Sequence, residues 1–311
     1  MKWMGSDALA GLPIAIVGCG FIGRRMVEMF SEAGHPVTAL GLDEPPEELA
    51  RAADRIVVGD AADREVLKST IDGAAHVIWT AGGLMPREAE LDPEIDRERT
   101  LGPLRTLASF GPELVGKTVT YMSSGGTVYG NPGREPVGED HPPAPIGAYG
   151  RNKLLAEEFL QGAAAEIGFK LRILRCSNVY GPNQPSDRGQ GAVAVFGDRI
   201  ANGREIEVFG DGGAFRDYIH VDDVVRATAL LWEQDGPVIL NCGSGEAMTI
   251  FGLIEALERS LGRKAIITRL PSRGFDVSGV VLDISRIRSL IDFEPMDLET
   301  GLQGGLRLGA G

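Results

Sequence analysis

Tyr149 and Lys153 stand four residues apart in the segment YGRNK, at the start of a stretch with helical periodicity. On a helix, this spacing places both side chains on one face, one turn apart. An ammonium group beside a phenol favours the phenolate, so Lys153 is expected to lower the pKa of Tyr149. The pair therefore predicts a general base that works near neutral pH.

Hydroxyl-bearing residues precede this pair in the segment TYMSSGGTVYG (120–130). The segment begins as a buried strand, and its polar residues follow where the strand ends. Ligands of parallel sheets bind in the crevice outside the carboxyl ends of the strands. A hydroxyl here could share a hydrogen bond with the substrate oxygen that loses its proton.

Three glycines, Gly18, Gly20 and Gly23, have the spacing G-x-G-x-x-G between a predicted strand and a predicted helix. In this context the first permits a tight turn, the second lets the backbone approach a pyrophosphate, and the third lets helix and strand pack closely. The backbone N–H groups of Phe21 and Ile22 begin the helix and would face the phosphates. The pattern predicts a dinucleotide site; the alternative is a purely structural turn.

Further candidate cofactor residues follow the next strands. Asp43 comes after the second predicted strand and is the candidate acceptor for the adenosine ribose hydroxyls, or else a surface acid. No arginine follows this strand to hold a 2′-phosphate, so NAD is favoured over NADP. Asp60, after the third strand, would bind the adenine amino group or form the N-cap of the next helix. Ala81, which follows the fourth predicted strand, is the last candidate cofactor-binding residue.

Short apolar runs alternate with longer amphipathic stretches in the first half of the chain. The alternation predicts right-handed βαβ units, and hence an α/β fold with a doubly wound parallel sheet of the Rossmann type. The predicted strands are Leu12–Val17, Val37–Leu42, Arg55–Val58, His76–Thr80, Thr118–Ser123 and Leu171–Ser177. The predicted helices are Ile22–Ala33, Asp63–Ile71, Ile95–Phe110 and Tyr149–Ile167.

The pattern becomes less regular after Pro182, which indicates a second, smaller lobe. We expect a dinucleotide-binding domain over residues 12–177, to which the chain returns around 215–243. The substrate-binding lobe is expected over 178–214 and 244–311.

Composition narrows the class of protein. The 311 residues are 43% hydrophobic, enough for a sizeable core, and the net charge of −13 argues against a nucleic-acid partner. Cys19, Cys176 and Cys242 are widely spaced without C-x-x-C, which predicts reduced core thiols and no metal site. No apolar run reaches membrane-spanning length, and we expect a cytoplasmic protein without a membrane partner.

Together the motifs resemble the extended short-chain dehydrogenase/reductase family, specifically its NAD-dependent nucleotide-sugar epimerase/dehydratase group, of which the UDP-glucose 4-epimerases are members. The resemblance runs from about Leu12 to Leu302. Further segments that carry it are GDAAD (59–63), RCSNVYGPNQ (175–184), FGDGGAFRDYIHVDDVV (209–225), LNCGSGEAMTI (240–250) and LDISRIRSLIDFEP (282–295).

The resemblance implies roles for individual residues. Tyr149 would take a proton from a sugar hydroxyl, usually at C4, while NAD takes the hydride from the same carbon. Lys153 would hold the nicotinamide ribose and tune the tyrosine. Asn178 and Arg216 would bind the diphosphate of a nucleotide sugar, where arginine suits bidentate bonds.

Alternatives remain for the residues around this diphosphate site. Asn178 could be a turn residue before Tyr180, and Arg216 could form a salt bridge to Asp217 or Asp222. Asp222 and Asp223 are expected to cap the helix that follows them.

The chain departs from the family pattern at three positions. Val17 stands where the first family glycine falls, and Gly41 stands where the ribose-binding acid falls, two residues before Asp43. Gly125 takes the place of the catalytic serine or threonine. Ser124 or Thr127 could supply the missing hydroxyl, and Thr127 is favoured because the family often has a threonine there.

Two more positions bear on the active-site helix. Ser123 is expected to be structural. Arg99 stands where an asparagine commonly supports that helix in the family.

Among the reactions of the family, epimerisation is favoured over 4,6-dehydration. A dehydratase needs a carboxylate just after its catalytic threonine, whereas Gly126 and Thr127 occupy those positions here. A keto-sugar reductase is a third possibility, and a redox-sensing NAD(P)-binding protein without catalysis is a fourth. The resemblance also implies a homodimer, in which the helices near 95–110 and 149–167 of both subunits form a four-helix bundle.

Overall fold

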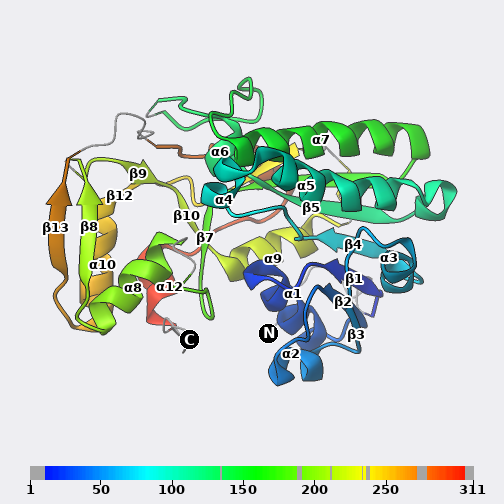
Figure 1. Ribbon diagram of the computed structural model, residues 1–311, viewed down its shortest axis with the longest axis horizontal. Helices are drawn as coiled ribbons and strands as arrows, with labels where there is room; N and C mark the ends of the chain where they lie inside the picture. Colours follow the sequence, from blue (N-terminus) through cyan, green and yellow to red (C-terminus); the bar gives the residue numbers. More distant parts are fainter. Residues whose placement is uncertain are drawn as a thin grey trace.

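A seven-stranded parallel sheet forms the centre of the molecule (Figure 1), with strand order β11-β6-β5-β4-β1-β2-β3. The computed structural model describes residues 11–133, 135–187, 191–210, 212–232, 234–235, 239–271 and 279–304. The strands of the sheet are β1 (Ile14–Val17), β2 (Val37–Gly41), β3 (Arg55–Val58), β4 (His76–Trp79), β5 (Thr118–Ser124), β6 (Lys170–Cys176) and β11 (Ile239–Cys242). The predicted α/β fold of the Rossmann type is confirmed.

Helices cover both faces of this sheet, because alternate residues of each strand are buried on opposite faces. Ile14 and Ile16 of β1 belong to one hydrophobic cluster, whereas Ala15 and Val17 belong to the other. The first cluster packs against α1 (Phe21–Glu32), α9 (Val221–Leu230) and α11 (Ser285–Leu290). The second packs against α3 (Arg64–Ile71), α5 (Pro93–Ala108) and α7 (Ala148–Ile167).

A third hydrophobic cluster lies beside the carboxyl ends of the central strands (Figure 1). Its buried residues lie mainly on α8 (Ala192–Ala201), β8 (Glu205–Phe209), α10 (Ile250–Leu261) and α12 (Leu298–Gln303), and β13 (Ile266–Leu270) pairs with β8. Short strand pairs connect it to the sheet, namely β7 (Asn178–Tyr180) with β10 (Tyr218–His220) and β9 (Phe215–Arg216) with β12 (Met248–Thr249).

Short helices that the sequence pattern did not indicate stand in the connections: α2 (Glu47–Ala52), α4 (Pro86–Leu91) and α6 (Gly125–Val128). A 3₁₀ turn, η2 (Gly111–Leu114), follows α5. Within the described ranges, no helix is long and apolar enough to cross a membrane.

Helix caps differ from two expectations. Asp63, not Asp60, is the N-cap of α3 and accepts hydrogen bonds from the N–H groups of Glu65 and Val66. The carboxylate of Asp60 instead accepts from the N–H of Ala62 at 2.8 Å, which closes a turn.

The start of α9 also corrects a prediction. His220 is its N-cap and accepts from the N–H of Asp222. Asp222 forms an ion pair with Arg25 of α1, and Asp223 pairs with Arg226. Neither aspartate caps the helix, because both side chains are engaged by arginines.

Candidate active site

The glycine turn lies at the carboxyl end of β1, against the end of β4. Gly18 has φ +107°, and a Cβ there would lie 2.5 Å from the nitrogen of Ala81. A Cβ at Gly23 would lie 1.8 Å from the Gly18 carbonyl oxygen, which also accepts from Thr80 Oγ1 at 2.6 Å. A Cβ at Gly20, in contrast, would meet nothing within 4 Å. The outer glycines are therefore required by protein packing, and the middle one faces open space.

The start of α1 fits a bound phosphate. Gly20 is the N-cap and provides no side-chain hydrogen bond to the first N–H groups of the helix. Phe21 and Ile22 follow directly, so their N–H groups carry the positive end of the helix dipole. The open Gly20 and the uncapped helix start are the features that a dinucleotide pyrophosphate needs.

The end of β2 lies next to this turn. Gly41 is buried, and a Cβ there would lie 3.3 Å from Cys19 Cβ and 3.4 Å from the Asp43 carbonyl oxygen. The chain therefore bends directly after the strand. Asp43 is exposed, and its carboxylate has no hydrogen-bond partner among the described residues.

Tyr149 and Lys153 lie in the first turns of α7, as predicted. Glu90 of α4 accepts a hydrogen bond from the N–H of Ala148 and so holds the start of the helix. Lys153 is buried, and its Nζ donates to the Met122 carbonyl oxygen at 3.0 Å. The same Nζ lies 5.8 Å from the centroid of the Tyr149 ring.

Lys153 also connects the pair to the glycine turn. A Cβ built on Gly82 would lie 3.6 Å from Lys153 Nζ. The residue before it, Ala81, contacts Gly18 and donates its N–H to the Val17 carbonyl oxygen at 2.8 Å. The structure thus brings the two sequence motifs to the same edge of the sheet.

Burial dominates the ionisation of this pair. It raises the pKa of Tyr149 to about 12, with a further contribution from Asp96. Burial also lowers the pKa of Lys153 to about 8. The prediction that Lys153 lowers the pKa of Tyr149 is therefore wrong for this structure, because the ammonium group is directed at the Met122 carbonyl and loss of hydration outweighs its charge.

Gly125 has no room for a side chain. A Cβ there would lie 2.7 Å from Leu282 Cδ1 and 2.9 Å from the Arg175 carbonyl oxygen. The neighbouring Ser123 is buried and donates its hydroxyl to Glu157, as expected of a structural residue.

Two hydroxyl groups remain available at this edge. Ser124 is half-buried, and within the described ranges its hydroxyl has no hydrogen-bond partner. Thr127 Oγ1 lies 3.5 Å from the Ser124 carbonyl oxygen, at the limit of a hydrogen bond. A Cβ at Gly150 would lie 2.9 Å from the Thr127 carbonyl oxygen, so α6 packs on the first turn of α7 and the Thr127 backbone meets the residue after Tyr149.

Asn178 lies in β7 and not in a turn, so the turn interpretation is wrong. Its Nδ2 donates to the Asp217 carbonyl oxygen at 2.9 Å and lies 3.8 Å from a Cβ built on Gly126. Asn178 is therefore close to the segment that carries Thr127.

Arg216 does not form either of the salt bridges considered above. The Asp217 carboxylate accepts from the N–H groups of Ser244 and Leu282, and Asp222 pairs with Arg25. Arg216 Nη1 donates to the Phe215 carbonyl oxygen at 2.7 Å, and no carboxylate of the described chain forms an ion pair with it.

Asp96 supports α7, and its role was not predicted from the sequence. Asp96 is 1% exposed and accepts from the Leu84 N–H at 2.6 Å and from Asn152 Nδ2 at 2.7 Å. It joins α5 to α7 next to Tyr149. Arg99, which stands where an asparagine commonly supports this helix in the family, is exposed. The signal in the sequence was an acidic residue at a helix position that faces the protein interior.

A buried ion pair lies behind Lys153. Arg175 of β6 and Glu157 of α7 are 3% and 0% exposed, and Arg175 Nη2 lies 2.6 Å from Glu157 Oε2. Arg175 also donates to Tyr129 Oη at 3.0 Å. These contacts fix α7 to the sheet one turn beyond the lysine.

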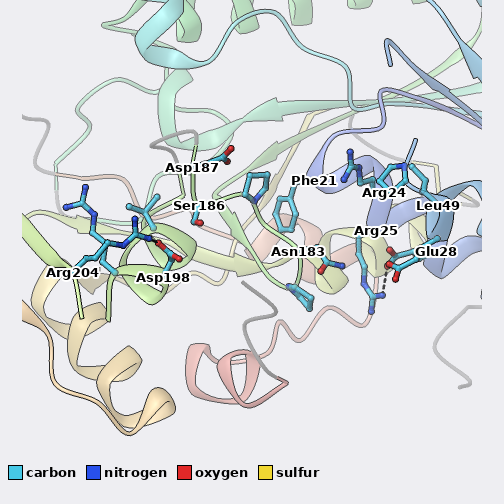
Figure 2. A pocket seen from close by; sticks show the side chains of 16 residues that line it. Phe21, Arg24, Arg25, Glu28, Leu49, Asn183, Ser186, Asp187, Asp198 and Arg204 are labelled. Carbon is cyan, nitrogen blue, oxygen red and sulfur yellow. Dashed lines mark hydrogen bonds and ion pairs between the residues drawn. The ribbon is translucent and has the colours of Figure 1, made fainter. Parts of the chain in front are cut away.

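A cavity of about 710 Å³ opens beside the glycine turn, between α1 and the chain that follows β7 (Figure 2). Phe21 lies in its middle, with Arg24 and Leu49 toward one end and Asp198 and Arg204 toward the other (Figure 2).

Cys19, Cys176 and Cys242 are free thiols. The described part of the chain contains no group of three metal-ligating side chains.

Comparisons with known proteins agree with this geometry. The model of the NAD dependent epimerase/dehydratase family matches residues 14–243. The UDP-glucose 4-epimerase of Azospirillum brasilense is 31% identical over 316 residues, covering 93% of this chain and 89% of that protein. The dTDP-4-dehydro-6-deoxyglucose reductase of Escherichia coli is 29% identical over 292 residues, covering 89% and 90%. The structure of the Thermotoga maritima UDP-glucose 4-epimerase with UDP-glucose has a TM-score of 0.85 at 30% identity, covering 94% and 96%.

Proposed function

The chain belongs to the NAD-dependent epimerase/dehydratase family, and on that premise we propose that it epimerises a nucleotide-activated hexose, a UDP-hexose, at C4. The observation that carries the proposal is the contact of Lys153 with Gly82, which places the Tyr149 pair beside the glycine turn. The UDP-glucose 4-epimerase relatives support the choice of substrate.

In this proposal Tyr149 moves the proton. It takes the proton of the sugar 4-hydroxyl in the first half-reaction and returns it in the second, so the phenol ends unchanged. NAD held along the glycine turn would supply the hydride acceptor and donor for C4 and a positive charge beside the phenol. That charge and Lys153 must offset the burial that holds the pKa of Tyr149 near 12.

Other residues would hold the ligands. Gly18, Gly20, Gly23 and the first N–H groups of α1 would hold the pyrophosphate of NAD, with Asp43 at the ribose and Asp60 and Ala81 nearby. Asn178 and Arg216 would bind the substrate diphosphate, which agrees with the lack of a carboxylate partner for Arg216 among the described residues.

Thr127 would replace the hydroxyl that Gly125 cannot supply, with Ser124 in second place. Its support is the packing of α6 on the first turn of α7. No carboxylate stands at Gly126 or Thr127, which favours epimerisation over dehydration.

The decisive experiment incubates UDP-glucose and UDP-galactose separately with purified protein and no added cofactor. We expect interconversion, detected by chromatography and by NMR at C4. Tyr149→Phe should lower the rate at least about 100-fold, the lower range for loss of a general base. Tyr180→Phe is the matched control, because the buried Tyr180 hydroxyl has no hydrogen-bond partner in the described chain.

Turnover that needs added NAD(P)H and a keto-sugar would instead support the reductase, which the Escherichia coli relative represents. Tight cofactor binding without any turnover would support the sensor.

We further propose a cytoplasmic homodimer that pairs α5 and α7 of both subunits. These helices lie along one edge of the molecule (Figure 1), and their outer surface includes a hollow of about 460 Å³ lined by Phe159, Gly162 and Glu166. Leu155, on the same helix, is 37% exposed. Light scattering should give the dimer mass, and Leu155→Asp should shift it toward the monomer.

A further inference from the structure

We propose that Arg24 holds a 2′-phosphate on the adenosine ribose, so that the site accepts NADP as well as NAD. The inference rests on the proposed function, because it assumes that a dinucleotide binds along the glycine turn. It concerns the adenosine end of the cofactor, which takes no part in the proposed reaction at C4 of the hexose.

The end of β2 carries no carboxylate. In dinucleotide-binding folds, an acid near this position binds the ribose 2′-hydroxyl, and an arginine nearby accommodates a 2′-phosphate instead. Gly41 occupies the strand end, and a Cβ there would already lie 3.3 Å from Cys19 Cβ. The next residue, Leu42, is 70% exposed and cannot accept a hydrogen bond through its side chain. Asp43 is the nearest acid, and it is exposed to water.

Arg24 is held at the same corner. Its Nε donates to the Cys19 carbonyl oxygen at 3.0 Å, inside the glycine turn, and Cys19 is the residue that contacts the Gly41 position. Figure 2 shows Arg24 beside Leu49, at the end of the cavity formed with α2, the helix that follows β2.

Among the described residues, the two terminal nitrogens of the Arg24 guanidinium have no partner, unlike those of Arg25. Arg25 donates to Asp222 at 2.6 and 2.9 Å and to Glu28 at 2.9 Å. Arg24 is exposed, and across the described residues no carboxylate forms an ion pair with it. Its two terminal nitrogens can therefore form a bidentate pair with a phosphate, for which a planar guanidinium is suited.

The carboxylate of Asp43 repels this phosphate electrostatically, because both groups are negatively charged. Because Asp43 is exposed, water and salt screen the repulsion, whereas a bidentate arginine–phosphate pair has fixed geometry. The balance predicts a site that accepts both cofactors and not one restricted to NAD.

The test measures binding, so it does not depend on turnover. NAD⁺, NADP⁺ and 2′,5′-ADP are titrated calorimetrically into wild-type protein, Arg24→Ala, Arg24→Lys and Arg51→Ala. We expect wild-type affinities for NAD⁺ and NADP⁺ within about tenfold of each other. Arg24→Ala should weaken NADP⁺ and 2′,5′-ADP at least about tenfold and leave NAD⁺ nearly unchanged, since a charge-assisted pair is lost only with the phosphate. Arg24→Lys should give an affinity for NADP⁺ between those of wild type and Arg24→Ala, because lysine keeps the positive charge but lacks the parallel N–H donors of the guanidinium.

Arg51→Ala is the matched control, because Arg51 is an exposed arginine of α2 and should not distinguish the two cofactors. Binding of NAD⁺ with NADP⁺ at least about 100-fold weaker would overturn the inference and leave the proposed function standing. Equal loss of both cofactors, or no loss, in Arg24→Ala would also overturn it. If no dinucleotide binds to the wild type, both the inference and the proposed function fail.

Discussion

Gly125 stands where the family resemblance implies a serine or threonine, and packing explains why no side chain fits there. We predict that Gly125→Ser destabilises the fold by about 1–3 kcal/mol, the usual cost of overpacking a filled site. The new Cβ would press on Leu282 and on the backbone of Arg175. Urea unfolding measures the change in the free energy of unfolding.

Gly126→Ala is the control for this prediction, because its Cβ would meet nothing closer than 3.8 Å. A Gly125→Ser variant that folds as well as wild type and turns over faster would contradict the packing argument.

The parts of the candidate site that depend only on residue type and spacing could be predicted from the sequence. The glycine turn and Tyr149 with Lys153 are local patterns, and the structure brings them together. Asp96 depends on contacts with Leu84 and Asn152 in other elements, so no local pattern identifies it. The pKa of Tyr149 was predicted in the wrong direction because burial cannot be read from an i, i+4 pair.

Helix α7 carries Tyr149, Lys153 and the buried Glu157, so its attachment to the sheet matters for stability and, in the proposed function, for activity. We predict that Glu157→Ala lowers the free energy of unfolding by about 3–5 kcal/mol, because Arg175 would keep a buried charge without its partner. The measurement is denaturant unfolding followed by circular dichroism.

The adjacent Glu158 provides the comparison, since it is exposed. Glu158→Ala should change stability by no more than about 0.5 kcal/mol. Equal effects of the two variants would show that the ion pair does not anchor α7.

Among the elements, the long strands and helices of the first half were predicted within about two residues. The apolar runs of β1, β4 and β5 are buried on both faces, so the pattern is strong there. The short helices were missed for a physical reason. Gly125–Val128, for example, has the sequence GGTV, whose helix propensity is poor, and its packing against α7 and β6 accounts for the helix.

At the scale of the whole molecule, stability should depend on pH through a buried histidine. His76 stacks on Trp232 with ring centroids 4.3 Å apart, and burial lowers its pKa from 6.5 to about 4. Between these values the unfolded chain binds more protons than the folded one, so stability falls as the pH is lowered from 6.5 toward 4. The loss from this residue amounts to at most about 3 kcal/mol.

Replacement of the histidine tests this prediction. His76→Phe should flatten the pH dependence in urea unfolding at pH 7.5, 6 and 5, and a smaller slope should remain because burial also lowers the pKa of His220. His141→Phe, at an exposed position, should leave the slope unchanged. An unaltered slope in His76→Phe would reject the assignment.

The pairing of β11 with β6 has a consequence for how the chain is made. Leu240 and Cys242 lie beside Leu174 and Cys176, so the edge strand of the sheet comes from residues that follow α8 and β8 of the third cluster in the sequence. A chain that ends at residue 177 lacks β11, so its β6 edge exposes unpaired N–H and C=O groups. Folding in order of synthesis therefore cannot complete the nucleotide-binding half first. A fragment that ends after β6 should aggregate, whereas one that includes residue 242 can add β11 and complete the sheet.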